Sequence, residues 1–258
     1  MSVDPQARVG FQRGAARYER GRPEAPAAAV SALVDALKIS DRSTVVELGA
    51  GTGKLARLLA PRAGRYLAVE PVPGMRRQFR QRLPEVPLVG GLAEHLPVPS
   101  RRVDAVVAAQ AFHWFDVPRA MGEIRRVLAL TGHVGLLWNV RDESVDWVRQ
   151  ATAILDRYDP GGPRFRHRAW QEAWERTPGF EPLRRQSFPF VQPLDRASAL
   201  DRFTSVSFIA SLEPERYAEA EADLRALFDR HPQTAGRTVI ELPHECEIYT
   251  ARPTWGPE

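Results

Sequence analysis

Short apolar runs alternate with amphipathic stretches between residues 44 and 140. Runs such as TVVEL (44–48) and VDAVVAA (103–109) do not alternate apolar with polar residues. Strands of this kind are buried on both faces, as in a parallel sheet covered by helices. The pattern predicts strands over 44–48, 65–70, 86–90, 103–109 and 132–140, with helices over 53–60, 74–83 and 119–130. This order of strands and helices predicts a doubly wound α/β core.

The pattern changes on both sides of this core. Residues 1–24 are polar and rich in arginine, with Phe11 and Tyr18 as apolar anchors, and we expect an arm or lid there. Apolar residues at helical spacing predict a helix over 27–38. Later on, the spacing predicts helices over 145–158, around Trp170 and Trp174, and over 217–228, with strands over 180–190 and 238–251. We expect one domain, with an N-terminal arm (1–30), a cofactor-binding core (31–141), and a substrate lid with the last strands (142–258).

Composition fits a soluble enzyme better than a membrane or nucleic-acid-binding protein. The start of the chain lacks the apolar segment of a signal peptide, and no apolar run approaches the length of a membrane helix. The net charge is +4, but the basic residues are scattered among acids, and all except Lys38 and Lys54 are arginines. Cys246 is the only cysteine, so no internal disulfide forms. We therefore expect a cytoplasmic protein that binds neither membranes nor nucleic acid.

Residues 45–55, VVELGAGTGKL, combine features of two phosphate-binding loops. A triphosphate loop needs Ser or Thr after its lysine to bind magnesium, but Leu55 follows Lys54. A dinucleotide loop needs a small residue at the position that Lys54 occupies, because the helix packs against the strand there. Neither pattern is complete. The glycines still allow a tight turn and a close approach of the backbone to a ligand, so we expect a cofactor loop.

The spacing of Glu47, Gly49, Gly51 and Gly53 resembles the first signature of class I S-adenosylmethionine-dependent methyltransferases. YLAVEP (66–71) resembles the second strand of that family with its terminal acid, and the segment 90–116 resembles the stretch between the third and fourth strands. AQAFHWFD (109–116) and the N-terminal ARYERGRPEAP are similar to the subgroup near the trans-aconitate methyltransferases. The resemblance implies a Rossmann-like, mostly parallel seven-stranded sheet with an antiparallel last strand.

The resemblance also implies a set of cofactor contacts. Glu70, 19 residues after Gly51, could accept both ribose hydroxyls, and Ala93 and Glu94 would meet the adenine edge. Residues 110–114 would cover the other side of the cofactor, and Tyr18 and Arg22 could reach its carboxylate. The cofactor-binding residues expected for S-adenosylmethionine are Tyr18, Arg22, Glu47, Gly49, Ala50, Gly51, Gly53, Glu70, Pro71, Met75, Ala93, Glu94, Gln110 and Ala111.

His113 is the titratable residue best placed to act as a general base, because an imidazole titrates near working pH. The alternative is that its ring packs beside Trp114 and hydrogen-bonds to the backbone. Both residues are expected to contact the substrate. Met75 could touch adenine or belong to the core, and Glu47 could cap the loop amides as well as bind the ligand. The remaining histidines have no metal-ligand spacing, and we expect no metal site.

The predicted function is methyl transfer to oxygen, a carboxylate or nitrogen of a small molecule. Three alternatives remain open. An NAD-linked oxidoreductase would also use an acid such as Glu70. A nucleic-acid methyltransferase often has an Asn/Asp-Pro-Pro-aromatic loop where this chain has AQAFHW. The third is a noncatalytic module with the same fold. The sequence does not identify the methyl acceptor or the oligomeric state.

Overall fold

The computed structural model describes residues 18–255, so Phe11 and the rest of the arm up to residue 17 lie outside the described residues. A short helix over 18–21 precedes the first labelled element. The elements are α2 (Ala27–Leu37), β1 (Thr44–Leu48), α3 (Ala56–Leu59), η1 (Ala60–Arg62), β2 (Arg65–Val69), α4 (Pro73–Arg82), β3 (Leu88–Val89), β4 (Val103–Ala109), η2 (Phe112–Trp114), α5 (Val117–Val127), β5 (Leu128–Arg141), α6 (Asp146–Asp156), η3 (Phe165–His167), α7 (Ala169–Arg176), β6 (Arg184–Asp195), α8 (Arg196–Thr204), α9 (Ser207–Ala210), α10 (Pro214–Arg230) and β7 (Val239–Ala251).

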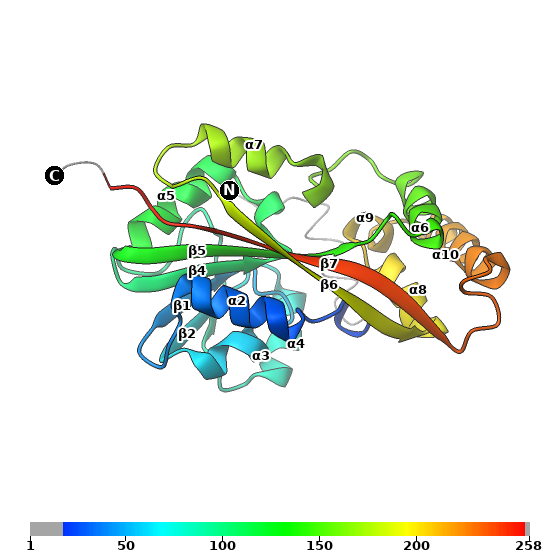
Figure 1. Ribbon diagram of the computed structural model, residues 1–258, viewed down its shortest axis with the longest axis horizontal. Helices are drawn as coiled ribbons and strands as arrows, with labels where there is room; N and C mark the ends of the chain where they lie inside the picture. The colour runs from blue at the N-terminus through cyan, green and yellow to red at the C-terminus, as the bar shows by residue number, and fades with distance from the viewer. Residues whose placement is uncertain (1–17, 256–258) are drawn as a thin grey trace. The chain divides into compact units, whose positions relative to one another are not determined.

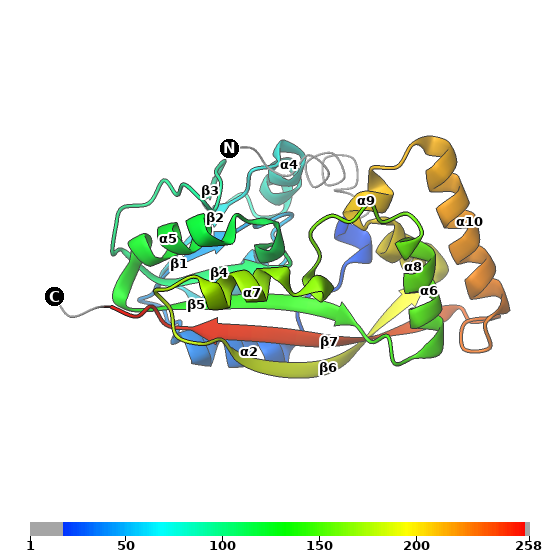
Figure 2. The ribbon, with the colours of Figure 1, turned by 90° about the horizontal axis from the view of Figure 1, so that it is seen from above.

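The strands form one seven-stranded sheet in the order β3-β2-β1-β4-β5-β7-β6. Strand β1 pairs in parallel with β2 and β4, β2 with β3, and β4 with β5. Strand β7 runs opposite to its neighbours (Figure 2). Helices α2 and α3 lie on one face of the parallel part, and α5 and α7 lie on the other (Figure 1). This is the Rossmann-like, mostly parallel sheet with an antiparallel end that the sequence predicted.

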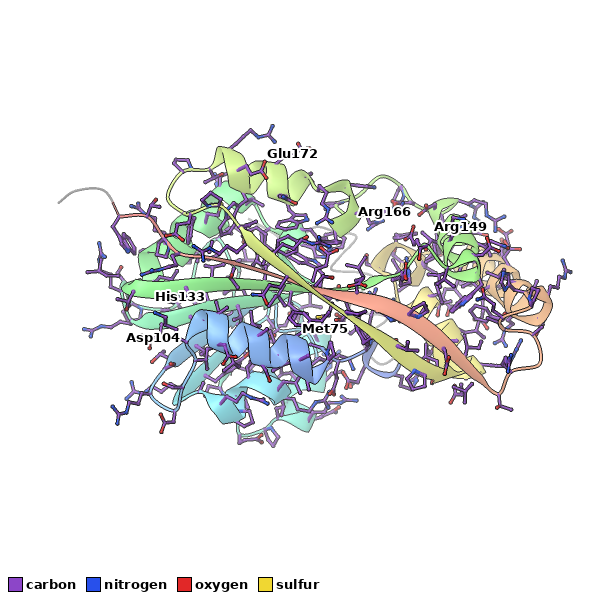
Figure 3. All side chains as sticks on the ribbon, viewed as in Figure 1. Met75, Asp104, His133, Arg149, Arg166 and Glu172 are labelled. Atoms are coloured by element: carbon purple, nitrogen blue, oxygen red, sulfur yellow. The ribbon has the colours of Figure 1, made fainter. Side chains whose placement is uncertain are left out.

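The apolar runs form the interior of the sheet, as their lack of alternation requires. Val45, Val46 and Leu48 in β1 are each at most 1% exposed. At the start of the same strand, the Thr44 N–H donates to Oδ2 of Asp104 in β4 at 2.8 Å. Asp104 is labelled in Figure 3. This hydrogen bond satisfies a backbone donor at the amino-terminal end of β1, whereas the glycine loop follows its carboxyl end.

The chain forms two compact units. The core unit comprises Glu24–Trp138, Pro163–Phe188 and Cys246–Glu258, and it contains the parallel strands and the glycine loop. The helical unit comprises Met1–Pro23, Asn139–Gly162 and Pro189–Glu245. Its helices α6, α8, α9 and α10 pack around a separate apolar cluster that includes Trp147, Phe203 and Phe228. The boundaries predicted at residues 30 and 141, and the prediction of one domain, remain predictions.

Several element boundaries differ from those predicted. The helix predicted over 119–130 ends at Val127, because Leu128 already pairs with Val103 as part of β5. Helices α8 and α9 were not predicted. Helix α8 begins after Asp195, whose side chain accepts a hydrogen bond from the Ser198 N–H at 2.7 Å. That Asp is a typical N-cap and was the available sequence signal.

Candidate functional site

The glycine loop joins β1 to α3 in the core unit, and it is held in place by the carbonyl of Val69 at the end of β2. The N–H groups of Gly49 and Ala50 both donate to this oxygen, at 2.8 and 3.1 Å. Gly49, Gly51 and Gly53 have φ angles of 65°, 58° and 90°. Side-chain-bearing residues rarely adopt this region, so the turn requires glycine at each of these positions.

The three glycines differ in what surrounds them. A Cβ at Gly49 would lie 2.6 Å from Cβ of Ala111, and one at Gly53 would lie 2.7 Å from Cδ1 of Leu83. A Cβ at Gly51 would have no atom within 4 Å. Gly49 and Gly53 therefore allow close packing inside the protein, whereas Gly51 borders open space in which a ligand can approach the backbone.

Glu70 follows β2 and is bonded to the loop. Its Oε2 accepts from the Gly51 N–H at 2.8 Å, and its Oε1 accepts from the Val72 N–H at 2.7 Å. The side chain is 4% exposed, and burial raises the pKa of Glu70 to about 7 although both N–H groups lower it. A carboxylate has about four lone-pair sites, so each oxygen of Glu70 retains acceptor capacity for a ligand hydroxyl.

Glu47 is the second buried carboxyl group at this end of the sheet. It is 1% exposed, and its Oε2 accepts from the Tyr66 hydroxyl at 2.8 Å. Burial raises the pKa of Glu47 to about 8, the hydrogen bond from Tyr66 lowers it, and the charge of Glu70 raises it further. Its hydrogen bond therefore comes from β2 and not from the loop amides considered for it. No local pattern in the sequence pointed to Tyr66 as a partner of Glu47.

The start of α4 is fixed by Arg76, a residue with no distinguishing signal in the sequence. Its Nη1 donates to the carbonyl oxygens of Glu70 and Pro71, at 2.8 and 2.7 Å. Pro71 thus forms part of the turn after β2. Met75 is 3% exposed and lies within the fold (Figure 3).

The residues after β3 and β4 meet the glycine loop and α5. The Ala111 side chain packs where Gly49 leaves room, and Ala93 is 5% exposed. Oε1 of Glu94 accepts from the N–H of Asp116, the N-cap of α5, at 2.8 Å. Gln110 has a φ angle of 58°, and its N–H donates to the carbonyl of Leu137 at 2.8 Å. This left-handed backbone turns the chain away from β4 toward η2.

His113 in η2 accepts a hydrogen bond from a tryptophan. Nε1 of Trp138 lies 3.2 Å from Nδ1 of His113. Indole can only donate, so Nδ1 is the acceptor and the neutral imidazole carries its proton on Nε2. The ring lies 5.1 Å from that of Trp114 between centroids, as the packing alternative expects, and the hydrogen bond at Nδ1 comes from a side chain.

Aromatic rings from several elements gather next to His113. The Trp138 ring stacks on Trp170 with 4.5 Å between centroids, and Tyr249 meets Trp170 edge-on at 5.2 Å. The other rings of this aromatic wall are Phe112, Phe165 and Trp174. Trp170 and Trp174 lie in α7, within the helix predicted around them, whereas no sequence signal pointed to Trp138 or Tyr249.

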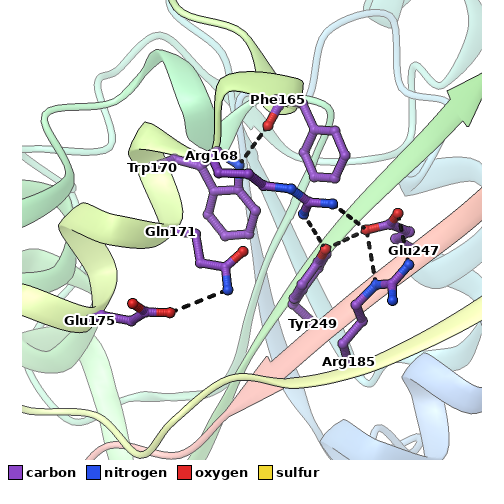
Figure 4. A network of polar contacts seen from close by, with 8 residues as sticks. All are labelled: Phe165, Arg168, Trp170, Gln171, Glu175, Arg185, Glu247 and Tyr249. Carbon is purple, nitrogen blue, oxygen red and sulfur yellow. Dashed lines mark hydrogen bonds and ion pairs between the residues drawn. The ribbon is translucent and has the colours of Figure 1, made fainter.

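A polar network closes one side of the aromatic wall (Figure 4). Arg168 Nη1 donates to the Tyr249 hydroxyl at 2.5 Å, and Tyr249 in turn donates to Glu247. Arg185 also binds Glu247, through Nε at 3.1 Å and Nη2 at 3.0 Å. Burial alone would raise the pKa of Glu247, but the hydrogen bonds from Arg185 and Tyr249 lower it overall. Glu247 is therefore an ion-paired structural carboxylate.

Tyr18 and Arg22 belong to the helical unit. The guanidinium carbon of Arg22 lies 5.2 Å from the centre of the Tyr18 ring. Their expected contact with the cofactor carboxylate remains a prediction.

A family model described as a methyltransferase domain matches residues 46–136, which span the glycine loop, Glu70, Glu94 and His113. The methyltransferase-like protein C25B8.10 of Schizosaccharomyces pombe is 34% identical over 242 residues, which cover 93% of this chain and 94% of that one. The chain belongs to the class I S-adenosylmethionine-dependent methyltransferases. A methyltransferase of Mycobacterium tuberculosis, Rv3342, is 34% identical over 236 residues and covers 92% of each chain.

The same fold also occurs in a solved structure with another activity. The [4+2]-cyclase SpnF superposes on this methyltransferase with a TM-score of 0.58 at 18% identity, covering 99% of both chains. The fold alone therefore does not specify methyl transfer. The family assignment rests on the sequence relatives and on the matched domain.

The loop residues of the methyltransferase fit S-adenosylmethionine. Open space borders Gly51, two carboxyl groups end adjacent strands, and the loop has no Ser or Thr after Lys54 to hold a nucleotide-bound metal ion. Within residues 18–255, no group of three or more metal-ligating side chains comes together. In the same part of the chain, no helix has the length and apolar character needed to cross a membrane.

Proposed function

We propose that the methyltransferase moves a methyl group from S-adenosylmethionine to oxygen, a carboxylate or nitrogen of a small molecule. The observation that carries this proposal is the aromatic wall next to His113. Its central rings, Trp138 and Trp170, are 1% and 3% exposed, so they form a packed apolar backing to His113, which like Trp114 is only half-buried. Two half-buried aromatic rings suit a small ligand better than a phosphate backbone.

The cofactor-binding residues are proposed to act through the glycine loop and the two buried carboxyl groups. Glu70 would accept the ribose hydroxyls through the lone pairs that Gly51 and Val72 leave unused. Gly51 would border the cofactor, and Ala93 with Glu94 would lie at the adenine edge. Gly49, Ala50, Gly53, Pro71 and Met75 would support this surface by holding the turns after β1 and β2.

When bound, S-adenosylmethionine supplies an electrophilic methyl group on a sulfonium. The protein must then hold the acceptor atom in line with this group and exclude water. His113 and Trp114 are proposed to contact the acceptor. Because Trp138 donates to Nδ1, the neutral His113 ring presents N–H at Nε2, which suits it to orient the acceptor. To act as a base, His113 would need the other tautomer, in which Nδ1 carries the proton and the bond from Trp138 is lost.

Two measurements test the proposal. Calorimetry should show binding of S-adenosylhomocysteine and none of NADH, because the loop lacks the third small residue of a dinucleotide site at Lys54. A screen of small carboxylic acids, phenols and amines with radiolabelled S-adenosylmethionine should then identify the acceptor. Trans-aconitate belongs in this screen because of the resemblance of residues 109–116. Binding of NADH but not of S-adenosylhomocysteine would contradict the proposed cofactor.

A further inference from the structure

Arg202 is a buried cation that has no negatively charged partner among residues 18–255. It lies on α8 in the helical unit and is 1% exposed. Its Nε and Nη1 atoms are buried and have no hydrogen-bond partner in the described part of the chain. A guanidinium keeps its proton in proteins and is costly to bury unless an anion or several acceptors surround it. Arg202 therefore requires an explanation beyond packing.

The contact of Arg202 with His244 does not provide a negative charge. Arg202 Nη2 lies 3.5 Å from His244 Nε2, and His244 Nδ1 lies 2.9 Å from the carbonyl of Leu242. Nδ1 must donate to that carbonyl, so Nε2 is the acceptor of a neutral ring. Burial, followed by the charge of Arg202, lowers the pKa of His244 to about 2. His244 thus accepts one N–H of Arg202 as a neutral group.

The other charges close to Arg202 are also positive. After burial, the causes that lower the pKa of Arg202 are the charges of Arg22 and Arg141, with a smaller opposing effect of Tyr18. Arg22 Nε is itself buried and has no hydrogen-bond partner. The nearby carboxylate of Asp201 is bound on its Oδ2 by Arg20, at 2.8 Å. Arg202 and Arg22 are therefore not neutralised by an acid among the described residues.

The chain holds Arg22 beside α8 by a close backbone contact. A Cβ at Gly21 would lie 2.5 Å from the backbone nitrogen of Arg202, so only glycine permits this approach. Gln192 Nε2 donates to the Gly21 carbonyl at 3.0 Å, and Asn139 Nδ2 donates to the Pro23 carbonyl at 3.3 Å. These contacts fix the backbone on both sides of Arg22. The juxtaposition of Arg22 and Arg202 is thus built into the fold of the helical unit.

We propose that Arg202 and Arg22, with Arg141 beside them, bind an oxyanion group, a carboxylate or a phosphate, of a small-molecule ligand. Guanidinium groups match the geometry of these anions and bind them with paired N–H donors. Two molecules of the proposed reaction could carry the group: an acidic acceptor, or the cofactor through the carboxylate of its methionine portion. The choice between these molecules rests on the proposed function, whereas the anion site itself does not.

The test compares Arg202→Met with Arg225→Met. Both substitutions remove one positive charge and keep a long side chain, but Arg225 is on the exposed surface of α10, paired with Glu221. The ligand-free Arg202→Met protein should melt at a higher temperature than the wild type, because an unpaired buried charge is replaced by an apolar side chain. Tricarballylate and inorganic phosphate should raise the melting temperature of the wild type and of Arg225→Met. Half-saturation by tricarballylate should need at least tenfold more ligand in Arg202→Met.

A second variant, Arg22→Met, should weaken the response to both anions in the same direction. The site is refuted if neither anion stabilises the wild type. It is also refuted if Arg202→Met lowers the melting temperature and keeps the wild-type response, which is the behaviour of a purely structural arginine.

Two further ligands identify the molecule that carries the anion. If Arg202→Met weakens binding of S-adenosylhomocysteine but not of its analogue without the carboxylate, the site binds the cofactor. If it leaves both affinities unchanged and loses the tricarballylate response, the site binds the acceptor. Either result supports the site. Wild-type affinity for S-adenosylhomocysteine is measured in the same series, so a failure of the proposed function would be seen separately from a failure of the anion site.

Discussion

The backbone N–H of Gly51 and the Oε2 atom of Glu70 are hydrogen-bonded at 2.8 Å, although the two residues are 19 positions apart in the chain. The bond ties the turn after β1 to the end of β2. Gly51 and Glu70 were predicted as cofactor contacts from separate motifs, and in the structure they are bonded directly to each other. The loop is held in a fixed position by the same carboxylate that is proposed to receive the ribose, so a change at either residue is expected to affect the other.

Gly51→Ala should weaken S-adenosylhomocysteine binding at least tenfold, because the methyl group would project into the open space beside the loop. The φ angle of 58° adds a stability cost of about 1–2 kcal/mol. Gly236→Ala is the matched control, since Gly236 has a φ angle of 67° and open space around a Cβ. It should lose similar stability and keep full affinity in calorimetry. Equal affinities of Gly51→Ala and the wild type would refute the role of Gly51.

Gly53→Ala should be less stable than Gly51→Ala, because its Cβ would lie 2.7 Å from Cδ1 of Leu83. Overpacking of this kind adds about 1–3 kcal/mol to the backbone cost. Urea unfolding of Gly53→Ala, Leu83→Ala and the double variant measures the interaction. Leu83→Ala removes the colliding atom, so the double variant should be more stable than the sum of the single effects predicts. Simple additivity would show that this contact does not limit position 53.

Glu47→Gln should flatten the dependence of stability on pH. In the folded protein Glu47 keeps its proton up to about pH 8, whereas an unfolded glutamate, whose pKa is 4.5, releases it near pH 4.5. The folded state thus binds more protons between these values, and its free energy of unfolding falls as pH rises, by about 1.4 kcal/mol per pH unit.

The useful range for this measurement is pH 6.5 to 8. Below pH 6.5, His244 changes the free energy of unfolding in the opposite direction. Its pKa is lowered to about 2 in the folded protein, so at these pH values the imidazole is protonated only in the unfolded state. Over this range the wild type should lose about 1–2 kcal/mol more than Glu47→Gln in urea unfolding. Glu85→Gln, which removes an exposed carboxylate, is the control and should follow the wild type. Parallel curves for the wild type and Glu47→Gln would contradict the raised pKa.

His113→Ala should lower kcat at least tenfold and change the affinity for S-adenosylhomocysteine less than twofold, because the ring is proposed to contact the acceptor and not the cofactor. Trp138→Phe distinguishes the two roles of His113. It removes the donor to Nδ1. If His113 orients the acceptor through Nε2–H, Trp138→Phe should lower kcat. If His113 is a base, kcat should be maintained or rise, because Nδ1 can then carry the proton. An unchanged rate in His113→Ala would leave only a packing role.

Much of the core unit could be predicted because its signals are local. The apolar runs at 44–48 and 103–109 are strands whose burial on both faces follows from their composition. The positive φ angles of Gly49, Gly51 and Gly53 agree with a sequence that offers glycine at each turn position. The distinct roles of these glycines were not predictable, because they depend on Ala111 and Leu83, which approach from other elements.

The unpredicted features depend on contacts between distant segments. Nothing near Glu47 in the sequence indicates Tyr66 as its partner, since parallel pairing of β1 with β2 brings them together. The bond from Trp138 to His113 likewise joins β5 to η2. Arg202 was not identified among so many scattered arginines. The only local sign that Arg202 faces inward is its spacing. It follows Ala199 by three residues and precedes Phe203 by one, and both of these residues are fully buried.

Three strands pass through both compact units without a break. The boundaries between the units fall at residues 138/139, 188/189 and 245/246, which lie inside β5, β6 and β7. The part that holds the glycine loop therefore cannot be excised as a shorter polypeptide without cutting three strands and exposing their backbone groups. Nor can one helical unit be exchanged for another by joining sequences at a loop. A change of acceptor in this enzyme is thus expected to arise by substitution of individual side chains within a continuous framework.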